Sequence, residues 1–181
     1  MNRNIFKVQT LLPFLLAGSI LLLVVWYATN LYTIFSHDFV PWTGDEVSYV
    51  MEGKSFKENG TLHGVMLLKE KVAVLGSFGT HGFMYALTDG AILSFFHSEK
   101  SIIAFHFFLL AASVGFLFFL PVSWMHRLIA VLWVLLFYYP AYYTFTFMQE
   151  SLNMFFAVLA GVNLFILYRG NKKFRIHFLV L

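Results

Sequence analysis

The sequence lacks cysteine altogether and is poor in charged residues. Without cysteine, the chain forms neither disulfides nor cysteine metal sites, although this absence does not indicate a cellular compartment. Charged residues make up only 12% of the 181 residues, whereas a soluble domain carries about 25%. Hydrophobic residues account for 60% and aromatic residues for 20%. Such a chain cannot cover a water-facing surface with polar groups, so part of its solvent must be lipid.

Several familiar functional motifs are also missing. The sequence has no His-x-x-x-His metal-ligand spacing, no nucleophile elbow and no phosphate-binding glycine motif. The formal net charge of +3 does not indicate a nucleic-acid partner. The basic residues stand at the ends of apolar segments and not on one face of a domain. The chemistry must therefore be sought in polar residues between the apolar segments.

Four apolar segments are long enough to cross a bilayer, which needs about 20 apolar residues as a helix. They are residues 11–34, 102–120, 128–147 and 152–168, and residues 176–181 begin a fifth. The first is longer than a signal-peptide core of roughly 7–15 residues and has no cleavage site, so we expect it to be retained. We predict an all-α polytopic transmembrane bundle of four spans plus a truncated fifth. A fifth span cut short also predicts that the chain is the N-terminal part of a longer protein.

Basic residues in the short loops predict the orientation. Arg3 and Lys7 precede the first span, Arg127 lies between the second and third, and four basic residues follow residue 168. Cytoplasmic loops are enriched in lysine and arginine, so these segments are placed inside. Residues 36–101 and the short turn at Glu150 then face outside. We expect a multi-pass protein of the bacterial cytoplasmic membrane with its N-terminus inside.

The outer segment, residues 36–101, contains local order. Residues 45–53 predict a short helix, and residues 83–97 predict a second, apolar one that lies in the outer interface. On a helix, His81, Tyr85 and Asp89 fall on one face, each four residues after the last. If residues 83–97 crossed the membrane instead, the number of crossings would change. The basic loops could then no longer all face the cytoplasm.

Three places in the outward-facing parts are candidates for chemistry. Asp45 and Glu46 stand side by side after the first span, and a carboxylate held near apolar surface can act as a general base. The alternative is a solvated acidic turn at a helix start. His81 lies between glycines that allow close approach to a phosphate or a sugar hydroxyl, unless it is simply an interfacial histidine. Glu150 lies between two apolar spans, where an ionisable group is costly and so indicates a function. The alternative is an ordinary polar loop residue at the interface. By contrast, His106 and His126 look isolated.

The order of these parts resembles the N-terminal part of the polytopic GT-C glycosyltransferases, the class of the protein O-mannosyltransferases and aminoarabinose transferases. In that superfamily the first outer loop carries an acidic motif, matched here by Asp45 and Glu46. Residues 80–85 are similar to its histidine-containing segment, and Glu150 matches a second acidic position near the end of the third span. The resemblance covers most of this chain but only about the first third of a typical family member.

The resemblance implies an inverting transfer of a sugar from a polyprenyl-phosphate donor at the outer face of the membrane. Asp45 would be the general base. Glu46 or Glu150 would position the acceptor or a divalent cation, with Asp45 and Glu150 as the candidate metal ligands. The other residues implied in substrate binding are His81, Lys100, Tyr49 and Tyr85, of which His81 and Lys100 would hold the donor phosphate.

A second interpretation is a non-enzymatic polytopic membrane protein, either a transporter subunit or an assembly scaffold. Transporters place their polar residues and broken helices near the bilayer midplane. Here the ionisable residues concentrate at the predicted outer ends of the spans, which favours the enzyme. The partners implied are the lipid-linked donor, an acceptor and membrane lipids, with no nucleic acid and no certain cofactor.

Overall fold

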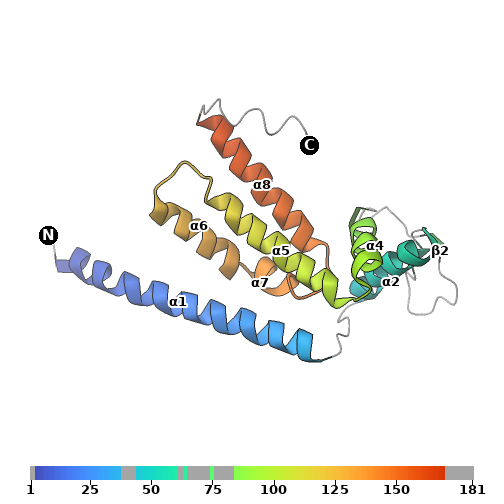
Figure 1. The fold of residues 1–181 in the computed structure, drawn as a ribbon. Coiled ribbons are helices and arrows are strands. Elements are labelled where there is room, and N and C mark those ends of the chain that lie inside the picture. Colours follow the sequence, from blue (N-terminus) through green and yellow to red (C-terminus); the bar gives the residue numbers. More distant parts are fainter. Residues whose placement is uncertain (1–2, 38–43, 61–62, 65–73, 76–83, 170–181) are drawn as a thin grey trace. The chain divides into compact units, whose positions relative to one another are not determined.

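The structure, a computed structural model, describes residues 3–37, 44–60, 63–64, 74–75 and 84–169 (Figure 1). Within these ranges the chain is helical apart from one pair of two-residue strands. The predicted helical class is therefore confirmed. The chain divides into two compact units, Met1–His37 and Asp38–Leu181, which are described separately below. The predicted fifth span at residues 176–181 lies outside the described residues.

The first unit is a single helix, α1 (Arg3–Ser36), and its part from Phe14 to Ser36 is long and apolar enough to cross a membrane. Some of the polar side chains in its C-terminal part bond within the helix. The Asn30 amide donates to the Trp26 carbonyl at 2.8 Å, and the Thr33 hydroxyl donates to the carbonyl four residues earlier at 2.9 Å. A polar group in hydrocarbon needs such a partner, because an unsatisfied one costs several kcal/mol, to order of magnitude.

The second unit contains six of the described helices and both strands. They are α2 (Gly44–Asn59), β1 (His63–Gly64), β2 (Val74–Leu75), α4 (Met84–Phe96), α5 (Lys100–Leu117), α6 (Trp124–Leu136), α7 (Tyr138–Tyr143) and α8 (Glu150–Tyr168). The strands pair antiparallel with His63 opposite Leu75. The helix predicted at 45–53 runs on to Asn59, and α4 lies where the helix at 83–97 was expected. Besides α1, the helices α5 and α8 are long and apolar enough to span a membrane.

The predicted third span, residues 128–147, is not one helix. The first part, α6, ends at Leu136, and α7 starts two residues later. Phe137 between them has an extended backbone with ψ of 139°. Pro140 explains the break, because a proline ring clashes with the carbonyl four residues earlier, here that of Leu136, and is tolerated in the first turn of a helix. The chain leaves the helix at Phe137 and restarts so that Pro140 falls in the first turn of α7.

The helices α5 and α8 run in the same direction and pack on each other (Figure 1). Near their C-terminal ends, Leu117 of α5 and Ile166 of α8 share a core with Val131 of α6. Near the start of α5, Phe107 packs against Phe145 of the segment before α8, with ring centroids 5.1 Å apart. Because α5 and α8 are parallel, α6 and α7 return the chain from the end of α5 to the start of α8.

The second unit is polar inside and apolar outside at many positions. Its buried side chains include Glu46, Asp89 and His106, all at most 1% exposed. Its exposed side chains include large apolar ones such as Phe108 and Trp133, which are 65% and 70% exposed. A soluble protein exposes contiguous apolar surface only in limited patches. This distribution fits a bundle whose outer surface meets lipid and whose interior holds the polar groups.

Two glycines bring α2 and α4 into close contact. A Cβ added at Gly90 would lie 2.6 Å from the Phe56 ring and 3.0 Å from the Gly53 carbonyl oxygen. A Cβ at Gly53 would lie 3.2 Å from the Cβ of Asp89. An ion pair between Lys54 and Glu99 also ties α2 to the short connection after α4. The two helices that contribute most of the candidate site are therefore held at a fixed crossing.

Candidate functional site

Six buried or half-buried polar side chains gather where α2 and α4 meet the starts of α5 and α8. We call them the polar cluster: Glu46, Tyr49, Tyr85, Asp89, His106 and Glu150. They come from four helices that are far apart in the sequence. In Figure 1 this is the end of the second unit at which α2, α4 and α7 lie.

Glu46 links α2 to the segment just before α8. Its side chain is 1% exposed, and its Oε1 accepts a hydrogen bond of 3.0 Å from the backbone N–H of Phe147. The two residues are 101 positions apart, and Phe147 is itself fully buried. The bond fixes the first turn of α2 to the segment that leads into α8. The carboxylate of Glu46 is thus buried in the bundle, whereas its neighbour Asp45 remains exposed.

The charges of three acidic side chains act on the hydroxyl of Tyr49. The pKa of the Tyr49 hydroxyl is raised, first by burial and then by the negative charges of Glu150, Asp45 and Glu52. These charges act on one hydroxyl although Asp45 and Glu150 belong to helices at opposite ends of the second unit's sequence. The structure therefore brings Asp45 and Glu150 to the same part of the bundle.

A chain of aromatic contacts connects Tyr49 to His106. The rings of Tyr49 and Tyr85 meet edge to face with centroids 4.9 Å apart. The Tyr85 hydroxyl lies 3.3 Å from Nε2 of His106, a hydrogen bond that links α4 to the second turn of α5. The expectation that His106 is isolated is wrong. Tyr85 is only 3% exposed, so it shapes the site from behind and does not line an open surface.

Asp89 belongs to the cluster, although its position one turn after Tyr85 was the only signal for it in the sequence. Its side chain is fully buried, and neither carboxyl oxygen has a hydrogen-bond partner of good geometry among the described residues. Burial raises the pKa of the Asp89 carboxyl well above its ordinary value, and an interaction with the Tyr85 hydroxyl lowers it only in part. A buried carboxyl of this kind favours its neutral, protonated form.

Replacing Asp89 with Asn should raise the thermal stability at neutral pH and change it little in acid. The pKa of Asp89 is raised in the folded protein above its unfolded value of about 3.9. The stability from its protonated form is fully present below that value and is lost as the pH rises through the folded pKa. Asparagine stays neutral at every pH, so the variant should not lose this stability as the pH rises. Melting temperatures of the purified protein from pH 4 to pH 8 test this.

The exposed Glu58→Gln variant is the control for Asp89→Asn, because it removes a carboxylate from the last turn of α2 without touching the cluster. The difference in melting temperature between Asp89→Asn and the unchanged protein should widen toward neutral pH. A difference that stays constant or narrows would contradict the raised pKa of Asp89.

The structure describes only one of the two predicted phosphate-binding residues. Lys100 is the first residue of α5 and is half-buried. His81 lies outside the described residues. Among the residues that the structure does describe, no group of three or more His, Asp or Glu side chains gathers to hold a metal ion. The divalent cation at Asp45 and Glu150 therefore stays a prediction.

The arrangement provides an exposed carboxylate beside a buried one, at one end of a bundle with many exposed apolar side chains. Asp45 can accept a proton from a molecule at the surface, while Glu46 and Phe147 hold the helix that carries it. Tyr49, Tyr85 and His106 form a layer of contacting side chains behind these residues.

No family model matches the chain, and no curated protein or solved structure matches it.

Proposed function

We propose that the protein is a membrane glycosyltransferase of the GT-C kind, which transfers a sugar from a polyprenyl-phosphate donor to an acceptor hydroxyl. The observation that carries the proposal is the placement of Asp45. It is exposed in the first turn of a helix that Glu46 fixes to the segment before Glu150. An acidic group held rigidly at the end of an apolar bundle is what a lipid-linked substrate requires, because its tail must remain in the bilayer while its head reacts at the interface.

In the proposed reaction, the carboxylate of Asp45 takes the proton from the acceptor hydroxyl. The acceptor oxygen forms a bond to the anomeric carbon, and the bond from that carbon to the phosphate oxygen breaks. Polyprenyl phosphate leaves with the electron pair, and the configuration at the anomeric carbon inverts. Glu150 acts near the same place, since its charge and that of Asp45 both reach Tyr49. Its proposed role is to orient the acceptor.

The donor phosphate requires positive charge and hydrogen-bond donors. His81 and Lys100 are the proposed donors, because charge-assisted hydrogen bonds to phosphate are about twice as strong as neutral ones. Tyr49 and Tyr85 were expected to bind substrate as well. Both are buried and their rings meet edge to face, so the role proposed for them is to form the wall behind the reacting groups, between α2 and α4.

The topology proposed for this function has the polar cluster on the outer side of the membrane. α5 and α8 each cross the membrane with their N-terminal ends outside. The pair α6 and α7 crosses in the opposite direction as a broken segment, because α6 alone spans only about 20 Å at 1.5 Å per residue. With α1 this makes four crossings, and the basic residues Arg127 and Arg169 lie inside.

The test uses the full-length protein, reconstituted in vesicles with a panel of radiolabelled polyprenyl-phosphate sugars and cell-envelope acceptors. Transfer of label from at least one donor, with release of polyprenyl phosphate, is the expected result. A protein that inserts correctly and releases no polyprenyl phosphate from any donor would favour a non-enzymatic role as a transporter subunit or scaffold.

A further inference from the structure

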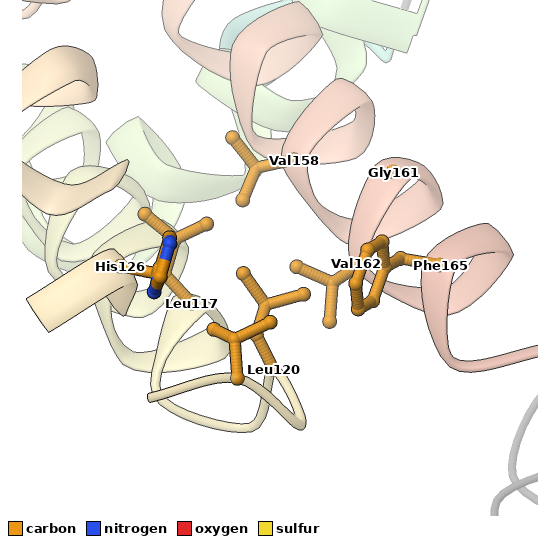
Figure 2. A pocket seen from close by; sticks show the side chains of 8 residues that line it. Leu117, Leu120, His126, Val158, Gly161, Val162 and Phe165 are labelled. Atoms are coloured by element: carbon orange, nitrogen blue, oxygen red, sulfur yellow. The ribbon is translucent and has the colours of Figure 1, made fainter. Parts of the chain in front are cut away.

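The end of the second unit away from the polar cluster has an open hollow of about 360 Å³ (Figure 2). Leu117 and Leu120 form one side of it, and Val158, Val162 and Phe165 of α8 form the other. Its wall is almost entirely aliphatic and aromatic. Such a surface offers nothing to a polar ligand but fits a hydrocarbon chain.

Basic side chains stand at the rim of this hollow. The Nε–H of Arg127 donates to the backbone carbonyl of Leu120 at 2.9 Å, and Leu120 lines the hollow. The guanidinium of Arg169 lies over the ring of Phe165, 5.4 Å from its centroid, and Phe165 lines the opposite side. His126 lines the hollow directly, as Figure 2 shows. Both arginines are thus held next to apolar side chains of the wall.

The charge at this rim has no acidic counterpart. The sequence has no Asp or Glu between Glu99 and Glu150, and none from Ser151 to Leu181. In the part of the chain that the structure describes, neither Arg127 nor Arg169 forms an ion pair. An anion from outside the chain is the natural partner for these two guanidinium groups.

We propose that this hollow binds an anionic phospholipid, with one acyl chain against its apolar wall and the headgroup phosphate on Arg127 and Arg169. The two halves of the ligand match the two parts of the site. A guanidinium presents a planar fork of donors that suits phosphate oxygens. Basic pockets between membrane helices bind anionic headgroups by the same chemistry. A free anion would leave the apolar wall unused, so the lipid is the occupant to which the site points.

The test compares two lipids that differ only in the headgroup, which is anionic in one and zwitterionic in the other. The full-length protein is purified in detergent and incubated with equal amounts of phosphatidylglycerol and phosphatidylcholine of the same acyl chains. Native mass spectrometry then counts each bound lipid. We expect bound phosphatidylglycerol to exceed phosphatidylcholine, and each arginine replaced with glutamine to lower that preference about fivefold. Equal binding of both lipids by the unchanged protein would overturn the proposal.

A second pair of variants tests the apolar part of the site. A Cβ added at Gly161, which lines the hollow, would meet no atom within 4 Å, so Gly161→Leu fills the space without a backbone clash. The matched control is Gly115→Leu on α5, where an added Cβ likewise meets nothing and which does not line the hollow. Gly161→Leu should lose most bound lipid of both kinds, and Gly115→Leu should retain it. Equal lipid retention by the two variants would contradict the binding of the acyl chain in this hollow.

Discussion

The Glu46→Ala variant is expected to lower the stability of the protein more than Asp45→Asn or Glu58→Ala. Glu46 is 1% exposed and accepts the buried backbone N–H of Phe147, 101 residues away. Alanine removes this acceptor from the buried N–H. A hydrogen bond to an ionisable group of this kind contributes about 2–3 kcal/mol. In a chain of this length that corresponds to a fall of about 5–10 °C in the melting temperature.

Two further variants separate the bond from the general effect of a substitution. Glu46→Gln keeps an oxygen that can accept from Phe147 N–H and should recover much of the loss. Glu58→Ala removes an exposed acidic side chain from the last turn of the same helix and should melt within about 1 °C of the unchanged protein, because exposed substitutions have small effects. A Glu46→Ala protein as stable as Glu58→Ala would show that the bond does not hold α2 to the bundle.

The Asp45→Asn variant is expected to show the largest change in activity. An amide cannot take the proton of the acceptor hydroxyl, and a positioned general base contributes about 10²–10⁴-fold to a rate. The fall should appear in kcat for sugar transfer, with little change in the KM for the polyprenyl-phosphate donor, because Asp45 acts on the acceptor. Asp45 is exposed, so the melting temperature should stay near that of the unchanged protein.

The matched control for Asp45→Asn is Glu52→Gln. Glu52 lies on the same helix and its charge also reaches Tyr49, but it has no role in the proposed proton transfer. Transfer should fall strongly in Asp45→Asn and stay within a few-fold in Glu52→Gln. Unchanged transfer in Asp45→Asn would remove Asp45 as the base while leaving the glycosyltransferase proposal open to another carboxylate such as Glu150.

The helices could be predicted because their signals are local. A long apolar run predicts a membrane-length helix whatever it packs against, which is why α5 and α8 lie where residues 102–120 and 152–168 were expected. From the sequence, Pro140 predicts a kink inside the third apolar segment, whereas the structure has a break there between α6 and α7. The break falls at Phe137 because the proline ring excludes the carbonyl four positions earlier from a continuous helix.

The contacts of the polar cluster could not be predicted, because they depend on packing between distant segments. Nothing in the sequence pairs Tyr85 with His106 or Glu46 with Phe147, since 21 and 101 residues separate them. Asp89 was visible only as a neighbour of Tyr85 on one helix face. Its burial follows from the close crossing of α2 and α4 at Gly90, which brings the two helices together over it.

The most direct test asks on which side of the membrane each end of the second unit lies. The polar cluster and the end of the bundle near Ser123 should lie on opposite sides of the membrane. Lys57, in the last turn of α2, and Ser123, before α6, are both exposed. Because the chain has no cysteine, Lys57→Cys and Ser123→Cys each carry a single thiol to label.

A membrane-impermeant maleimide applied to intact cells is the measurement. We predict that the thiol at residue 57 reacts at once, and that the thiol at residue 123 reacts only after the membrane is permeabilised. Labelling of both thiols from the same side would contradict the bundle's placement across the membrane, and with it the proposed outer site at Asp45.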